Sequence, residues 1–488
     1  MKNGILLQAF EWYLPSDGYF EDMIKKIPDL TAAGITAVWL PPQTKATGAF
    51  DVGYGVYDLY DLGEFDQKGE VRTKYGAKEQ YHKLIDALHE NGIQVYADVV
   101  LNHKASADEV ETFKAVRVNP ANRTEDQTEP YEIEAWTGFT FPGRAGKYSD
   151  FQWHWYHFTG VDYDNKNQEA GIFRILGDNK GWAYGVSGEK GNYDYLMFAD
   201  IDHHHPEVRE ELFRWADWYI QETGVDGFRI DAAKHIDANF MRDFIGHVQS
   251  HHGEDFYMLG EYWQTDDAIM DRYLYRTEYD MDLFDVKLHF NLVAAARGGE
   301  HYDMRRIFDN TIVREHPNLA VTFVNNHDSQ PGQALENFVD AWFIPSAYGL
   351  ILLRKDGYPC IFYGDYYGIS GEHPVPGHKD ALDLLMKIRG RLAHGDQEDH
   401  WINEHIFAWV RHGTDEHPNK LVTIVNNGPA DTITLNIGAD QAGREFVAVF
   451  GEQHESVWIG DDGGAAFMAG PGAITCWAEK DVFQTEPA

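Results

Sequence analysis

The clearest pattern in the chain is an amphipathic segment that ends at a glycine and is followed by a short apolar run. In KEQYHKLIDALHENG (78–92) the spacing i, i+3, i+4, i+7 is filled by apolar residues, Tyr81, Leu84, Ile85 and Leu88. This spacing predicts a helix with one buried face, which Asn91 and Gly92 end as a C-terminal cap. The run IQVYADVV that follows predicts a buried strand.

The same alternation recurs along most of the chain. Amphipathic segments precede apolar runs in DMIKKIPDLTAAG before ITAVWLPP, REELFRWADWYIQETG before VDGFRID, MRDFIGHVQSHHG before EDFYMLGEYW, and the segment ending KDG before YPCIFYGD. With ILLQAFEW at the start and LAVTFVNNHD near 320–328, at least seven strands are predicted. Such alternation favours a parallel sheet, closed as a (β/α)8 barrel. An open doubly wound sheet is the alternative, but no glycine-rich dinucleotide turn follows the first strand.

Two regions depart from this pattern. Residues 104–206 are rich in Gly, Asn, Asp and aromatic residues without a helical period, which predicts a domain inserted after the third strand. Beyond residue 394 short alternating runs such as KLVTIVNNG predict an antiparallel β domain. The predicted division is a barrel made of 1–103 and 207–394, an inserted domain at 104–206 and a C-terminal domain at 395–488.

Composition narrows the possible partners and location. The chain has 488 residues, more than one core of about 250–300 residues holds, and its net charge of −38 argues against nucleic acid and anionic membranes. No apolar run approaches a membrane span of about 20 residues. The start MKNGILLQAFEWY lacks a signal-peptide pattern. We therefore expect a cytoplasmic monomer, or a secreted protein if a leader was removed.

Polar side chains gather where four predicted strands end. These segments are DVVLNH (98–103), GFRIDAAKH (227–235), GEYW (260–263) and FVNNHD (323–328). In barrels of this kind the active site lies at the carboxyl ends of the strands. Asp231, Glu261 and Asp328 take comparable positions on three strands, and converging carboxylates are typical of glycoside hydrolysis. Arg229 shares a strand face with Asp231, so we expect it to keep that carboxylate ionised.

These four segments resemble the signature regions of the α-amylase family of glycoside hydrolases. Further likeness to its bacterial liquefying members lies in FEWYLPSDG, DVGYGVYDLYDLGEF, VRTKYG, FPGRAGKYSDFQWHWYHF, GNYDYLMFADID and DGYP. The resemblance is good over residues 4–365 and weak in the C-terminal domain. It implies retaining endohydrolysis of α-1,4-glucosidic bonds in starch, glycogen and maltooligosaccharides.

The resemblance also implies roles for single residues. Asp231 would be the nucleophile, Glu261 the general acid/base with a raised pKa, and Asp328 a third acid that favours ring distortion. A retaining mechanism expects the first two carboxyl groups about 5–5.5 Å apart. The resemblance also implies six substrate-binding residues. Tyr54 would stack beneath the sugar, and His103 and His327 would bond its hydroxyl groups. Lys234 and His235 would contact the reducing-side sugars, and Arg229 would lie beside the nucleophile.

Other activities occur on the same barrel, so two alternatives stay open. A transglycosylase or an α-1,6-acting enzyme shares the four segments, although Lys234 and His235 after the nucleophile favour α-1,4 hydrolysis. A sugar-binding relative without catalytic activity belongs to a different class, and the presence of all three carboxylates and Arg229 argues against it.

The stretch DIDHHHP (200–206) first suggests a transition-metal site. Three consecutive histidines diverge, however, and zinc ligands are usually spaced or drawn from separate segments. The resemblance implies instead one structural calcium ion held by oxygen atoms. Its ligands would be the side chains of Asn102, Asp194 and Asp200 and the backbone carbonyl of His235.

Liquefying members of the family also carry a calcium–sodium–calcium cluster near this site. Where they have carboxylates this chain has Thr159, Ala183 and His204, while Asp202 is kept. Loss of three anionic ligands removes most of the affinity for hard cations. We therefore predict one calcium ion and no second metal cluster.

Overall fold

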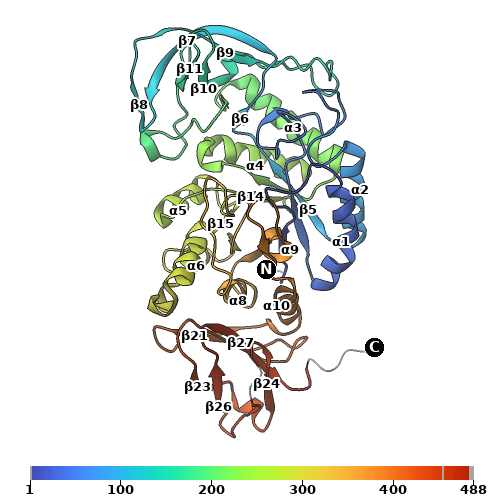
Figure 1. Cartoon of the computed structure of the whole chain (residues 1–488), viewed down its shortest axis with the longest axis vertical. Helices are drawn as coiled ribbons and strands as arrows, with labels where there is room; N and C mark the ends of the chain where they lie inside the picture. Colours follow the sequence, from blue (N-terminus) through green and yellow to red (C-terminus); the bar gives the residue numbers. More distant parts are fainter. Residues whose placement is uncertain (1–2, 453–454, 483–488) are drawn as a thin grey trace.

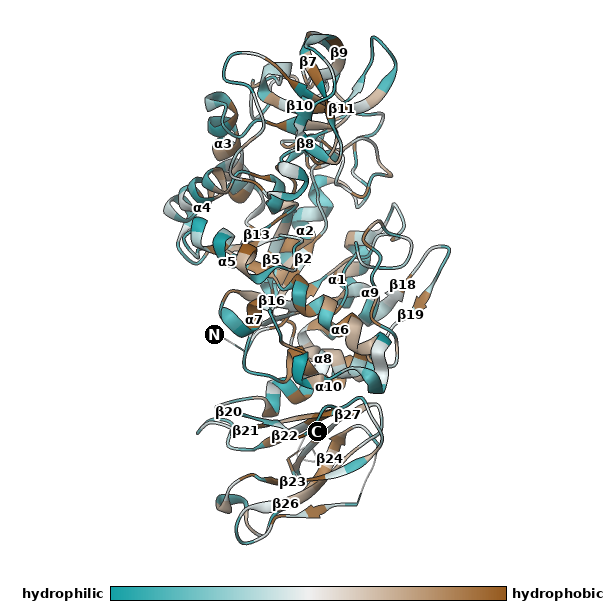
Figure 2. Cartoon of the chain, turned by 90° about the vertical axis from the view of Figure 1, so that its left-hand side faces the viewer, coloured by the Kyte–Doolittle hydropathy of each residue, from teal (hydrophilic) through white to brown (hydrophobic). Residues whose placement is uncertain are grey.

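The computed structural model describes residues 3–452 and 455–482. Residues 1–2 of the predicted barrel and residues 453–454 and 483–488 of the predicted C-terminal domain lie outside this description. The described parts stack along one long axis, with the inserted sheet at one end, the barrel in the middle and the C-terminal sheets at the other end (Figures 1 and 2).

Eight parallel strands pair side by side until the last meets the first, so the predicted (β/α)8 barrel is confirmed. In pairing order they are β1 (Leu6–Gln8), β2 (Ala37–Leu40), β5 (Gln94–Val99), β13 (Gly227–Ile230), β14 (Tyr257–Gly260), β15 (Asp282–Phe284), β16 (Ala320–Phe323) and β17 (Tyr358–Phe362). The strand that the sequence pattern did not reveal is β15. It has three residues, which are too few to show a period.

Helices cover the outside of the barrel (Figure 1). They are α1 (Tyr19–Ala33), α2 (Lys78–Glu90), α3 (Pro206–Thr223), α4 (Ala238–His252), α5 (Asp267–Arg276), α6 (Val286–Gly298), α7 (Ile312–Glu315), α8 (Ile344–Leu352), α9 (Tyr363–Tyr367) and α10 (Lys379–Leu392). The predicted buried face of α2 is confirmed. The helix ends at Asn91, and Gly92 follows with a left-handed φ of 72°. Among the described residues no helix is both long and apolar enough to cross a membrane.

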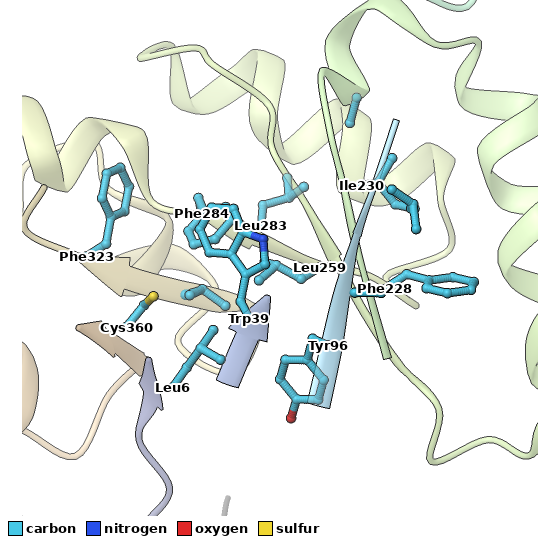
Figure 3. Packing of buried hydrophobic residues seen from close by; sticks show 14 of the residues in the cluster. Leu6, Trp39, Tyr96, Phe228, Ile230, Leu259, Leu283, Phe284, Phe323 and Cys360 are labelled. Carbon is cyan, nitrogen blue, oxygen red and sulfur yellow. The ribbon is translucent and has the colours of Figure 1, made fainter. Parts of the chain in front are cut away.

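The core has an inner and an outer layer (Figure 3). Trp39 and Phe284 meet inside the barrel with ring centroids 5.3 Å apart. Phe228 points outward instead and stacks on Trp215 of α3 at 5.8 Å. Alternating residues of one strand therefore fill the barrel and hold its helices.

An antiparallel sheet lies between β5 and α3 in the chain, inside the predicted inserted region (Figure 1). Its strands are β6 (His103–Lys104), β7 (Glu109–Asn119), β8 (Asn122–Asp126), β9 (Tyr131–Gly138), β10 (Phe158–Asp164), β11 (Glu169–Ile175) and β12 (Ala199–Ile201). The short strand β12 pairs with β6 and β10, so residues near 200 return to the end of β5. This return brings Asp200 close to the barrel.

Two antiparallel sheets form the C-terminal part, as predicted. Their strands are β20 (Gln397–Trp401), β21 (Ile406–Arg411), β22 (Leu421–Asn426), β23 (Asp431–Asn436), β24 (Glu445–Phe450), β25 (Val457–Trp458), β26 (Gly464–Ala469) and β27 (Ala473–Glu479). Gly349 of α8 leaves room for the side chain of Ile474 in β27, which would collide with a Cβ there. Two further short hairpins pair β3 (Lys45–Ala46) with β4 (Val56–Asp58) and β18 (Gly368–Ile369) with β19 (Val375–Pro376).

Replacing Phe228 with alanine tests the outer layer. Its ring is fully buried and also lies 5.0 Å from Phe256, so Phe228→Ala should lower the free energy of unfolding by about 3–5 kcal/mol. Urea unfolding followed by tryptophan fluorescence measures the change. The control Tyr275→Ala removes a ring that is 69% exposed and should change stability by less than about 0.5 kcal/mol. Equal effects of the two substitutions would contradict this packing.

Candidate active site

The side chain of Arg229 lies at the centre of a buried cluster of acids. Its Nη1 atom donates to Asp231 at 2.7 Å and to Asp98 at 2.8 Å. Its Nη2 atom forms an ion pair with Glu261 at 3.0 Å. The guanidinium has no solvent exposure, and the predicted contact between Arg229 and Asp231 is confirmed.

Asp98 is a member of this cluster that sequence reasoning missed. It is buried in β5, and its Oδ2 atom accepts hydrogen bonds from the Trp39 indole at 3.0 Å and the Tyr54 hydroxyl at 2.9 Å. An acid inside the apolar run IQVYADVV was the available signal, because a buried carboxylate needs a partner. Asp98 contacts Arg229 and Tyr54 and so acts as a positioning residue.

Glu261 follows directly after β14, and Asp328 lies in the loop after β16, five residues past its end at Phe323. The backbone N–H of Ala232 donates to Glu261 Oε2 at 3.2 Å. Ala232 has a φ of 52°, a left-handed conformation that is strained for a residue with a Cβ. The turn after Asp231 therefore directs a backbone donor at Glu261.

The three candidate catalytic acids open into one pocket of about 400 Å³ at the carboxyl ends of the barrel strands. Its walls are mostly apolar and aromatic, which suits the faces of sugar rings. The lining residues include all the predicted catalytic acids, most predicted substrate contacts and several residues that the sequence pattern did not single out: Trp12, Tyr54, His103, Tyr193, Leu196, Met197, Asp231, Lys234, His235, Glu261, Trp263, Asp328 and Leu335.

A hydrogen-bonded chain fixes the proton positions below this pocket. The Gln8 amide lies 2.9 Å from His327 Nδ1, and His327 Nε2 lies 2.7 Å from the Tyr54 hydroxyl. Because the amide nitrogen only donates, Nδ1 accepts and Nε2–H donates to Tyr54. The Tyr54 hydroxyl in turn donates to Asp98. His327 thus acts as a neutral link, and burial holds its pKa well below the ordinary value.

The other predicted substrate residues line the same pocket. His103 Nε2 lies 2.8 Å from the Tyr54 carbonyl, and burial lowers the pKa of His103 to about 4. His235 Nδ1 lies 2.6 Å from the Tyr193 carbonyl, and burial lowers its pKa to about 3. Lys234 pairs with Glu189 at 3.2 Å. Tyr193 and Glu189 come from the inserted region. Tyr193 lies within the segment GNYDYLMFADID that carries the resemblance, but its spacing indicated no role, and Glu189 had no signal in the sequence.

Burial governs the charge of the acids. It raises the pKa of Asp231 well above its ordinary value, with Arg229 acting against the rise and Glu261 adding to it. Burial, followed by repulsion from Glu261, raises the pKa of Asp328 to about 7. Arg229 lowers the pKa of Asp231, as expected, but desolvation and the neighbouring carboxylates raise this pKa by more.

The predicted calcium ligands lie close together between the barrel and the inserted sheet. Asn102, Asp194 and Asp200 are each at most 1% exposed, and Asn102 Nδ2 donates to Asp200 at 3.2 Å. Burial and mutual repulsion raise the pKa of Asp200, and burial raises that of Asp194 to about 7. Asn102 Oδ1 is buried, and no donor reaches it within the described residues. Two buried carboxylates beside a free carbonyl oxygen fit a hard cation such as calcium.

Side chains of the protein supply positive charge around Asp202, the residue at which no second metal cluster is predicted. Lys180 Nζ pairs with Asp202 at 2.6 Å, and both side chains are nearly buried. His204 Nε2 lies 3.3 Å from Asp237, a contact that raises the pKa of His204. Thr159 donates to Asp200 in place of an acid. Asp202 thus has a cationic partner within the protein.

The sequence matches a known family over most of its length. Residues 11–432 match the family described as "Alpha amylase, catalytic domain". The chain belongs to the alpha-amylase family. The resemblance noted from the strand-end segments is therefore confirmed.

Characterised relatives align with this alpha-amylase family member from end to end. The glucan 1,4-alpha-maltohexaosidase of Bacillus sp. (strain 707) is 47% identical, with 98% of this chain and 93% of that protein covered. The alpha-amylase of Geobacillus stearothermophilus is 46% identical, covering 98% and 87%. The cytoplasmic alpha-amylase of Escherichia coli (strain K12) is 41% identical, covering 99% and 100%. The likeness therefore includes the C-terminal part, where the sequence motifs showed it only weakly.

A solved structure shows the same fold at greater distance. The Anoxybacillus alpha-amylase aligns with a TM-score of 0.66 and 20% identity, and the alignment covers 97% of each chain. The barrel, the inserted sheet and the C-terminal sheets together therefore make up an architecture already seen in this family.

Replacing Asp328 with asparagine should stabilise the protein in a pH-dependent way. The folded pKa of about 7 lies above the value of about 3.9 expected for an unfolded chain. The ionised carboxylate therefore destabilises the fold at pH 8, whereas below pH 4 the group is protonated in both states. Asp328→Asn should raise the melting temperature by a few degrees at pH 8, with the gain shrinking toward pH 4.

Calorimetry between pH 4 and pH 8 measures this difference. Asp415→Asn, which alters an exposed acid, is the control and should leave the melting temperature unchanged at every pH. A melting temperature for Asp328→Asn that is equal to or below that of the wild type at pH 8 would contradict the raised pKa.

Proposed function

We propose that this glycoside hydrolase cleaves internal α-1,4-glucosidic bonds of starch, glycogen and maltooligosaccharides with retention of configuration. The observation that carries the proposal is the shared guanidinium of Arg229. Asp231 and Glu261 contact it at 2.7 Å and 3.0 Å, and Asp328 opens into the same pocket. Two carboxyl groups that share one guanidinium suit a covalent glycosyl intermediate, for which a separation of about 5–5.5 Å is expected, rather than direct attack by water.

In the first step Asp231 attacks the anomeric carbon while Glu261 gives its proton to the leaving oxygen. The bond from the anomeric carbon to that oxygen breaks as the bond to Asp231 forms. In the second step Glu261 takes a proton from water, which displaces Asp231 and restores the α configuration. Arg229 disperses the negative charge of Asp231 as it leaves.

The remaining pocket residues position the sugar rings. The ring of Tyr54 lies parallel to those of Trp12 and His327, with interplanar angles of 7° and 9°. We assign this stack to the sugar at the cleaved bond, with His103 as a hydroxyl partner. His327 lies beneath Tyr54 with both ring nitrogens bonded to the protein, so it would support the stack rather than bind a hydroxyl. Lys234 and His235 follow the nucleophile on the same turn and would contact the reducing-side sugars.

Transglycosylation is the alternative that the same four segments allow. Hydrolysis is favoured because relatives at 41–47% identity over nearly the whole chain are named as amylases or a maltohexaosidase. A cyclomaltodextrin glucanotransferase of Geobacillus stearothermophilus is only 23% identical. The complete set of acids around Arg229 supports catalysis over mere sugar binding.

We also propose one structural calcium ion. Asn102, Asp194 and Asp200 would hold it with the His235 carbonyl, and the bound ion would neutralise two buried carboxylates. It would join the inserted domain (104–206) to the strand ends that carry Asp231. The Lys180–Asp202 pair supports the absence of a second metal cluster, because the ammonium already balances this carboxylate.

A cytoplasmic monomer is the proposed form of the protein. Cys360 and Cys476 are both buried and unpaired, which suits a reducing compartment. The relative from Escherichia coli that aligns over its full length is itself named cytoplasmic. The net charge of −38 disfavours self-association.

Soluble starch tests the activity. Iodine colour should fall rapidly while reducing ends grow slowly, because internal cuts shorten the polymer before they release many small products. Asp231→Asn should lower kcat by roughly 10³-fold or more while its far-UV circular dichroism spectrum stays that of the wild type. The control Asp282→Asn alters a barrel acid that is bonded to Tyr257, outside the pocket, and should keep most of the activity. Wild-type protein that changes neither signal would refute the enzyme assignment, and an active Asp231→Asn would refute the nucleophile.

Metal analysis after exhaustive dialysis tests the calcium proposal. We expect one calcium ion per chain, and chelation should lower the melting temperature because Asp194 and Asp200 then repel each other. Asp200→Asn should abolish tight calcium binding, whereas Asp415→Asn should not. Two or three tightly held calcium ions per chain would contradict the single-ion proposal.

A further inference from the structure

A second group of side chains that could bind a metal lies on the outer helices, outside the catalytic pocket and the proposed calcium ligands. His247 and His251 stand four residues apart on α4. Their rings stack with centroids 4.1 Å apart and an interplanar angle of 28°. Residues at this spacing share one helix face, and paired histidines four apart are a common arrangement for binding Zn²⁺.

Asp217 of the neighbouring helix α3 completes the group. Its Oδ2 atom lies 3.1 Å from His247 Nε2. One ligand atom from each of Asp217, His247 and His251 falls within 4.8 Å of the others. Phe213 stacks on the His247 ring at 4.8 Å and 14°, which holds that ring in place. Three ligands from two packed helices are therefore already assembled.

Hydrogen bonds around the group prepare it for a metal. His251 Nδ1 lies 2.8 Å from the His247 carbonyl and must donate to it, which leaves the Nε2 lone pair of His251 free. The second carboxylate oxygen of Asp217 accepts from His252 Nε2 at 2.8 Å. Metal-binding histidines and carboxylates typically have such outer partners, which fix their orientation and tautomer.

We propose that Asp217, His247 and His251 bind a Zn²⁺ ion, with water as the fourth ligand. Two imidazoles and one carboxylate suit zinc, whereas calcium prefers oxygen atoms alone. The ion takes the place of the hydrogen between His247 Nε2 and Asp217. His247 then binds through Nε2 as a neutral imidazole with its hydrogen on Nδ1, and a proton passes to solvent only where the histidine was protonated before. His251 is exposed and the other two are partly buried, so the ion can enter from solvent.

The bound ion has a structural role. The helix α4 ends at His252, just before β14 begins at Tyr257, so the site lies near the amino-terminal ends of the barrel strands. The catalytic pocket lies at their carboxyl ends. Zinc at this position joins α3 to α4 and stabilises the barrel without touching substrate.

Titration of the full-length protein with ZnCl₂ tests the proposal. Calorimetry in buffer with saturating CaCl₂ keeps the calcium ligands occupied. We expect one zinc equivalent per chain and a melting temperature that rises with zinc. His251→Ala should weaken zinc binding by more than about tenfold, and His252→Phe, which removes an outer partner, by about tenfold. Co²⁺ in place of zinc should give the intense visible absorption of a tetrahedral site.

Matched controls separate this site from others. His316→Ala removes a surface histidine that is paired with Asp271 alone, at 2.9 Å, and should leave zinc binding unchanged. Asp231→Asn should also leave it unchanged, which excludes binding at the catalytic acids. The proposal is overturned if wild-type protein binds no zinc at 1 mM (a concentration about a thousandfold above a micromolar Kd), or if His251→Ala binds it as tightly as wild type.

Discussion

The buried guanidinium of Arg229 is the charge on which the catalytic pocket depends. It has no solvent exposure and contacts Asp98, Asp231 and Glu261. Taking one carboxylate out of water is costly, and grouping several without a cation would protonate them. Burial raises the pKa of Asp231, and Arg229, which serves three acids, offsets only part of that rise. The positive charge that develops on an oxocarbenium-like transition state would be stabilised by these neighbouring acids, in line with the proposed chemistry.

The same constraint governs the junction between the inserted sheet and the barrel. Burial raises the pKa of both Asp194 and Asp200, and Asp194 raises that of Asp200 further by repulsion. Asp202, two residues further on, has Lys180 as its partner at 2.6 Å. The proposed calcium would supply a cation to one part of the junction, and Lys180 supplies one to the other. Because the ammonium of Lys180 is part of the chain, it stays beside Asp202 when free calcium is scarce, and the charge of Asp202 stays balanced.

Much of the fold could be predicted because the barrel repeats one local pattern. The buried face and glycine cap of α2 follow directly from residue spacing. The prediction missed β15, whose three residues show no period, and it named no strands in residues 104–206, where β7 and β9 alternate only within long polar stretches. In the site, the acids at strand ends stood out. Asp98 did not, because it lies inside an apolar run.

The sequence by itself determined the element types, the order of the strands and which strand ends carry acids. Tertiary structure decided which of those acids share Arg229, how protons are arranged from Gln8 to Asp98, and that Lys180 reaches Asp202. The physical reason is that local patterns reflect neighbours a few residues away, whereas these contacts join side chains tens to hundreds of residues apart. Such contacts exist only once the barrel has closed and the inserted sheet has packed on its rim.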